Sequence, residues 1–184
     1  MSVRIKGQSV IAFERALRQL KGDGAMERIY PQIPSHVRHA VRYGEVLSVG
    51  WYPMTWLTSL HGAARLMFGS EISRAIGRTA TRHDVTTLYR FILKLVSPDR
   101  LIGQYARIFS LFCESGQVVI EEKGQRFAKV RCSGCTGASR GVWDDVLGST
   151  EVILELCGGR CPTARIVSGG EADEVVYMFT WGTV

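Results

Sequence analysis

The stretch ESGQVVIEEKGQRFAKVRC, residues 114–132, contains the point at which the periodicity of the chain changes. Before Gly116 the apolar residues recur at the spacing of one helix face, whereas after it they alternate with polar residues, as in a strand. Residues 117–122 and 126–132 therefore predict two strands, and Lys123-Gly124-Gln125 predicts the turn of a hairpin.

Further along, the pattern predicts one helix and two more strands. Apolar residues at helical spacing cover 143–157, and alternating runs cover 164–167 and 175–181. The C-terminal part thus reads as ββαββ with four antiparallel strands. Residues 151–156, EVILEL, are left open between helix and strand, because so short an apolar run fits both.

Helical spacing dominates the N-terminal part of the chain. Helices are expected over residues 9–20, 25–30, 35–43, 54–68, 70–78, 84–96 and 98–114. The last of these begins at Ser97-Pro98-Asp99, an N-cap followed by proline in the first turn. We predict one α+β domain, residues 1–184, with a helical part (1–115) packed on a four-stranded antiparallel sheet part (116–184).

Composition and charge narrow the class of protein. The 184 residues are 46% hydrophobic and 22% charged, which is ordinary for a globular chain. No apolar run is long enough to span a membrane and no signal peptide is recognisable, so we expect a cytoplasmic protein. The net charge of +6 divides into +8 for residues 1–116 and −2 for residues 117–184, so the positive excess lies in the helical part and could favour an acidic partner or an anionic membrane surface. No nucleic-acid motif accompanies it, so nucleic acid is not an expected partner.

Short motifs spread along the chain carry a resemblance to a known family. They are Ile5 to Val10, Trp51-Tyr52-Pro53, Ser97-Pro98, Glu114-Ser115-Gly116, Val130 to Gly134, Gly141-Val142-Trp143, Glu155 to Gly159, and Phe179-Thr180-Trp181. In order and spacing the chain resembles an uncharacterised family abundant in myxobacteria, itself similar to the heme–nitric-oxide-binding, vinyl-reductase-type and transport-particle (TRAPP) fold. The resemblance implies a ligand- or partner-binding module that is often dimeric, and we expect a homodimer.

Four cysteines in two close pairs are the sharpest candidates for chemistry. Cys132 and Cys135 form a C-x-x-C pair, and Cys157 and Cys161 form a C-x-x-x-C pair. Four thiolates suit a structural zinc ion, and the second pair resembles the zinc-bearing segment of vinyl-reductase-type domains. An unbroken helix over 143–157 would instead hold the pairs apart and leave free thiols. A zinc-stabilised or thiol-dependent enzyme or sensor is therefore the alternative function.

The resembled fold includes heme sensors, so the histidines are examined as possible heme ligands. His61 is the one candidate for an axial ligand. The Tyr-x-Ser-x-Arg motif that grips heme propionates in those sensors has no match in this chain. We therefore do not expect heme, and zinc at the four cysteines is the one resident cofactor left open. No histidine follows His83 to serve as a base for the cysteines, so we expect no enzyme.

Two surfaces complete the prediction. Aromatic and apolar side chains of the helices predict a pocket for a small hydrophobic ligand, lined by Trp51, Tyr52, Trp56, Leu60, Phe91 and Phe109. Arg74, Arg78 and Arg82 recur every four residues and form a basic helix face that could dock an acidic protein. The predicted function is a non-enzymatic binding, sensory or adaptor module that recognises a protein partner or a small hydrophobic ligand.

Overall fold

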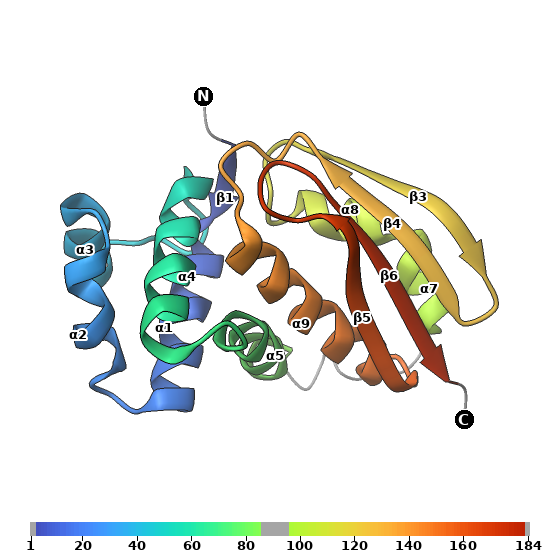
Figure 1. The fold of residues 1–184 in the computed structure, drawn as a ribbon, viewed down its shortest axis with the longest axis horizontal. Helices are drawn as coiled ribbons and strands as arrows, with labels where there is room; N and C mark the ends of the chain where they lie inside the picture. Colours follow the sequence, from blue (N-terminus) through green and yellow to red (C-terminus); the bar gives the residue numbers. More distant parts are fainter. Residues whose placement is uncertain (1–2, 86–95, 183–184) are drawn as a thin grey trace.

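The computed structural model describes residues 3–85 and 96–182, and helices dominate its N-terminal part (Figure 1). They are α1 (Gly7–Lys21), α2 (Ala25–Ile29), a 3-10 turn (Tyr30–Gln32), α3 (Ser35–Arg42), α4 (Met54–Phe68) and α5 (Ile72–Asp84). The amphipathic pattern of α1 buries Val10, Phe13 and Leu17 in the core. Most of the helix expected over residues 84–96 lies outside the described residues. Within the described ranges, no helix is long and apolar enough to cross a membrane.

A small two-stranded sheet supports the helices. Strand β1 (Arg4–Lys6) pairs antiparallel with β2 (Trp51–Pro53), and Ile5 faces Tyr52. Strand β2 was not predicted, because three residues are too few for alternation to be recognised. Its effect is to hold the start of α4 against the N-terminal strand.

The C-terminal part contains the predicted four-stranded antiparallel sheet. Its strands are β3 (Gln117–Gly124), β4 (Phe127–Ser133), β5 (Arg160–Gly169) and β6 (Val175–Gly182), in the order β3-β4-β6-β5. The central pair β4–β6 keeps its register throughout, whereas both outer pairs contain register shifts. The α+β fold class and the ββαββ order are confirmed.

Helix α9 (Arg140–Leu156) lies between the sheet and the helical part (Figure 1). It covers the inner face of the sheet, where Trp143 meets Tyr177 at a ring-centroid distance of 6.2 Å. Residues 151–156 belong to this helix, which settles the open choice between helix and strand. The helix also begins three residues before its predicted start at residue 143.

The single helix predicted over residues 98–114 is wrong. The structure has two short helices, α7 (Pro98–Gly103) and α8 (Tyr105–Ser110). Gly103 has low helix propensity, and the backbone of Gln104, with φ −103° and ψ 5°, leaves the helical range. The predicted N-cap is confirmed, since Ser97 Oγ accepts a hydrogen bond from Arg100 N at 3.3 Å.

The helical part and the sheet part meet most closely where α5 crosses α9. A Cβ atom on Gly77 would lie 2.0 Å from the carbonyl oxygen of Asp145, and one on Gly148 would lie 2.1 Å from that of Arg74. Only glycine permits this backbone contact. The polar side chains of the candidate site lie around it.

Candidate functional site

A buried histidine lies where α4, α5 and α9 meet. Of the four histidines, only His61 is buried, with no exposed area. Its Nδ1 is 3.0 Å from Ser73 Oγ, and its ring packs edge-on against Phe13 at 4.8 Å. Its Nε2 has no hydrogen-bond partner among the described residues and lies 3.8 Å from Asp145 Oδ1.

Burial controls the protonation of both groups. It lowers the pKa of His61 to about 3, with a smaller contribution from the nearby Arg65 guanidinium. It raises the pKa of Asp145 to about 7. Near neutral pH the imidazole is therefore uncharged, and its Nε2 lone pair or proton has no partner, which is costly for a buried polar atom. Such an atom is a candidate for binding a ligand.

The predicted basic face points at acids within the chain. Arg74 and Arg78 both form ion pairs with Glu151 of α9, whose side chain is only 5% exposed, and Arg82 pairs with Glu155 at 2.8 Å. The hydrogen bond to Glu151 raises the pKa of Arg74 further. The three guanidinium groups thus join α5 to α9, and their role in docking an acidic partner stays a prediction.

The two predicted cysteine pairs lie at opposite ends of the sheet part. Cys132 pairs with Val175 at the start of β6, whereas the segment after Cys157 lies against Trp181 near its end. Six residues of strand separate those ends by about 20 Å. The unbroken α9 explains this separation. No cluster of metal-ligating side chains is found in residues 3–85 and 96–182.

The predicted pocket residues do not come together as one cavity lining. Trp51, Tyr52 and Trp56 are neighbours, with 4.9 Å between the ring centroids of the last two. Leu60 is fully buried in the core. Phe109 of α8 lies beside Gly116 at the entry to the sheet, and Phe91 lies outside the described residues.

The segment that leads into these aromatic residues contains exposed apolar side chains. We call the two groups together the aromatic patch, which consists of Tyr43, Leu47, Val49, Trp51, Tyr52 and Trp56. Tyr43, Leu47 and Val49 are 67%, 65% and 76% exposed. The sequence signal for this patch is the group Val46, Leu47 and Val49 in the segment between Tyr43 and Trp51.

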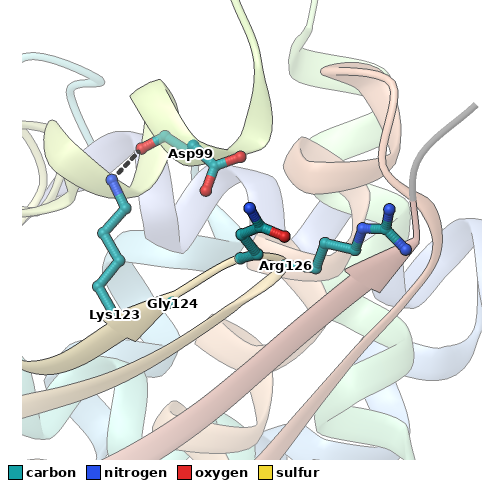
Figure 2. A pocket seen from close by; sticks show the side chains of 5 residues that line it. Asp99, Lys123, Gly124 and Arg126 are labelled. Carbon is teal, nitrogen blue, oxygen red and sulfur yellow. Dashed lines mark hydrogen bonds between the residues drawn. The ribbon is translucent and has the colours of Figure 1, made fainter.

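Two open hollows lie away from all of these residues. One, of about 590 Å³, is lined by Asp99 and the β3–β4 turn from Lys123 to Arg126. Figure 2 shows the Lys123 side chain reaching across to α7, where Nζ donates to the carbonyl oxygen of Asp99 at 2.8 Å. The other hollow adjoins it around Arg100 and Gln104. Neither contains a buried polar group aimed into it, so neither defines a site.

The fold is that of heme–nitric-oxide-binding domains, which confirms the resemblance predicted from the sequence. The chain is similar to an Fe(II) unliganded H-NOX protein from K. algicida, with a TM-score of 0.72 and 14% identity over 98% of each chain. It is also similar to a mutant of T. Tengcongensis H-NOX, with a TM-score of 0.56 and 14% identity over 97% of this chain and 98% of that one. No protein-family model and no curated protein sequence matches the chain. At these identities the likeness establishes the fold alone.

The comparison corrects our prediction about heme. One similar structure concerns heme redox potential and porphyrin distortion, and another concerns heme distortion in H-NOX proteins. Both of these structures are thus of heme proteins, and each covers 98% of this chain and 97% of its own. They contradict our expectation that heme is unlikely, which relied on one missing propionate-binding motif and gave the fold too little weight.

Proposed function

We propose that this chain is a non-enzymatic binding module of the sensory type that recognises a protein partner through its aromatic patch. The exposure of Tyr43, Leu47 and Val49 beside Trp51 carries the proposal. Contiguous exposed apolar surface is typical of interaction sites. Tryptophan and tyrosine also contribute more than other residues to binding energy at interfaces.

The patch is held in shape before any partner arrives. Leu47 N donates to the Tyr52 hydroxyl at 2.9 Å, and Lys6 Nζ donates to Val49 O at 3.2 Å. Backbone hydrogen bonds also tie Gly7 and Gln8 to the same loop. A surface ordered in advance loses less conformational entropy on binding.

The surrounding charge favours an acidic partner segment. Helix α3 beside the patch contains two arginines and two histidines and no acid. Lys6 Nζ lies over the Trp51 ring at 3.9 Å, and His36 packs against Trp56 at 5.7 Å. The partner class is therefore a peptide or protein segment that presents carboxylates next to apolar anchors. A small hydrophobic ligand is less well supported, because neither of the two hollows described above is lined by the predicted residues.

A peptide-binding experiment tests this assignment. Fluorescence anisotropy would measure binding of a labelled library of short peptides that combine glutamate with leucine and phenylalanine, together with matched peptides in which lysine replaces glutamate. We expect the acidic set to bind, and we expect the Leu47→Ser/Val49→Ser variant to bind at least about tenfold more weakly, the effect of losing about 1.4 kcal/mol. The control is Leu66→Ser, because Leu66 is 70% exposed on α4 outside the patch. Equal binding of the lysine peptides, or an equal loss in the control, would contradict the proposal.

The predicted homodimer is a competing occupant of the patch. Light scattering of wild type and of the Leu47→Ser/Val49→Ser variant separates the two cases. A wild-type dimer that becomes monomeric in the variant would show that a second copy covers the patch, and would replace the acidic partner.

Heme binding is a second candidate, favoured by the unpartnered Nε2 of His61. The imidazole fits the donor role, since it is neutral and its Nδ1 is held by Ser73. Its surroundings do not fit a porphyrin in this arrangement. Asp145 Oδ1 is 3.8 Å from Nε2, and a Cβ atom on Gly141 of α9 would lie 2.7 Å from the Cβ of His61. Heme could reach His61 only if α9 moved away from α4.

Titration of the purified chain with heme, followed by absorption spectroscopy, tests the second candidate. Binding of one heme per chain that is lost in His61→Ala and kept in His36→Ala, an exposed histidine, would support it. No saturable binding, or binding unchanged in His61→Ala, would exclude His61 as the ligand.

A further inference from the structure

Three buried cysteines from different segments converge at the corner where the helical part enters the sheet. Cys113 follows α8, Cys132 is in β4, and Cys135 is in the loop between β4 and α9. Cys113 forms an antiparallel bridge with Ile5 of β1. The loop of Cys135 is fixed by two backbone bonds, from Cys135 N to Asp173 O and from Val3 N to Thr136 O.

The thiols of Cys113 and Cys135 lie against the same dipeptide. The Cys113 thiol donates to Ser115 O at 2.8 Å, whereas the Cys135 sulfur lies beside Gly116 and its thiol donates to Ser133 O at 3.7 Å. The interaction between the two thiols is the largest effect on both groups, since it lowers the pKa of Cys113 and raises the pKa of Cys135. Cys113 is thus the thiol of the pair that ionises more readily, and thiolate is the reactive form of cysteine.

A glycine makes room for the sulfur of Cys135. A Cβ atom on Gly116, whose φ is +126°, would lie 3.0 Å from Cys135 Sγ, so any other residue would crowd the sulfur. Glu114, Ser115, Gly134 and Thr136, which flank the two cysteines in sequence, are exposed. Cys113 itself keeps 5% of its surface exposed, so a small oxidant can approach the pair from its side.

Cys132 differs from its two neighbours. It is held inside the sheet ladder between Val118 and Val175 and has no exposed area. Burial raises its pKa to about 12, which keeps it protonated and unreactive. It serves as an internal control for any chemistry of the other two.

We propose that Cys113 and Cys135 form a redox-active dithiol, which hydrogen peroxide converts into a disulfide that ties the end of α8 to the β4–α9 loop. The Cys113 thiolate attacks one peroxide oxygen and the O–O bond breaks, which gives a sulfenic acid and hydroxide. The sulfur of Cys135 then attacks the sulfenic sulfur, and the S–S bond forms as the Cys135 proton leaves with the hydroxyl group as water. The two thiols are oxidised by two electrons, and one peroxide is reduced to two waters.

The bond would join the two parts of the chain at a second place, far from the α5–α9 contact. Its consequence is covalent restriction of the corner where β1, α8 and the sheet meet. The inference does not depend on the proposed partner or on heme, and its test has a separate outcome.

Mass spectrometry of the full chain after peroxide treatment and alkylation tests the proposal. We expect the wild-type mass to fall by that of two hydrogen atoms, two thiols to become resistant to alkylation, and a peptide map to show Cys113 joined to Cys135. Dithiothreitol should reverse all three changes. Cys113→Ser and Cys135→Ser should each abolish the crosslink, whereas Cys161→Ser, at an exposed cysteine, should keep it.

Several results would overturn the proposal, and none requires the variants to fold. A wild-type map that joins Cys132 to either neighbour would do so, as would oxidation that stops at sulfinic acid. Wild-type thiols that all remain alkylatable after peroxide treatment would do so as well.

Discussion

Replacement of Gly77 by alanine tests whether the backbone contact between α5 and α9 holds the two parts of the chain together. The added Cβ would lie 2.0 Å from Asp145 O, where ordinary contacts begin at 3.4 Å, so the helices must separate or distort. Overpacking of this kind costs about 1–3 kcal/mol, and sometimes more. Alanine recovers up to about 1 kcal/mol through its higher helix propensity, and separation of the helices also weakens the ion pairs to Glu151. We expect a net loss of about 2 kcal/mol.

Urea unfolding followed by circular dichroism would measure the change, and thermal unfolding would check it. A loss of 2 kcal/mol corresponds to a Tm lower by about 4–8 °C for a chain of this size. Gly62→Ala is the matched control, because Gly62 lies in α4 with nothing within 4 Å of the new Cβ. It should gain about 0.5–1 kcal/mol from helix propensity alone. If Gly77→Ala were as stable as Gly62→Ala, the close contact between the helices would be refuted.

Three further predictions concern stability. Glu151→Ala removes the buried acceptor of two arginines and of a backbone N–H in β5, and should lower the free energy of unfolding in urea by about 2–3 kcal/mol. Glu155→Ala, the control at a half-exposed ion pair, should lower it by less than about 1 kcal/mol. Equal losses in the two variants would contradict this account. Ser97→Ala removes the N-cap of α7 and should cost about 1 kcal/mol in the same assay, and no loss would show that the cap is not formed in solution. Between pH 3.8 and 6.5 the unfolded chain holds one proton on His61 and the folded chain holds one proton on Asp145. The pair therefore makes the free energy of unfolding independent of pH in this range. Outside it, the free energy of unfolding should fall by about 1 kcal/mol as pH falls from 3.8 to 3 or rises from 6.5 to 7. In Asp145→Asn only the histidine remains, so stability should instead fall continuously below pH 6.5, and a retained plateau would contradict the assignment.

Most of the fold could be predicted from local patterns. Alternation after Gly116 gave the strands, and helical spacing gave α1 to α4 within a few residues. Helical spacing also predicted α9 through Gly148, but the choice between helix and strand for residues 151–156 stayed open. The reason for a glycine inside this helix is contact with the distant carbonyl group of Arg74. Local propensity contains no information about that neighbour.

The candidate sites were predicted less well, for the same reason. The basic stripe that begins at Arg74 was recognised, but its acidic partners lie more than seventy residues away on another helix. His61 was recognised as a candidate, whereas its neighbours Ser73 and Asp145 come from two other helices. The hairpin pairing would have revealed that Cys113 lies near Cys135. Gln117 faces Ser133, so the residues just before Gln117 must approach the residues just after Ser133.

The register shifts of the outer strands affect how the protein behaves at high concentration. An open sheet exposes unpaired N–H and C=O groups along both edges, and a straight edge strand can recruit a strand of another molecule. Here β3 is displaced between Ile120 and Glu122, and β5 between Arg160 and Thr163 and again between Ile166 and Ser168. Such bulges twist an edge and interrupt its row of free groups. The irregular borders therefore disfavour edge-to-edge pairing with a strand of another molecule.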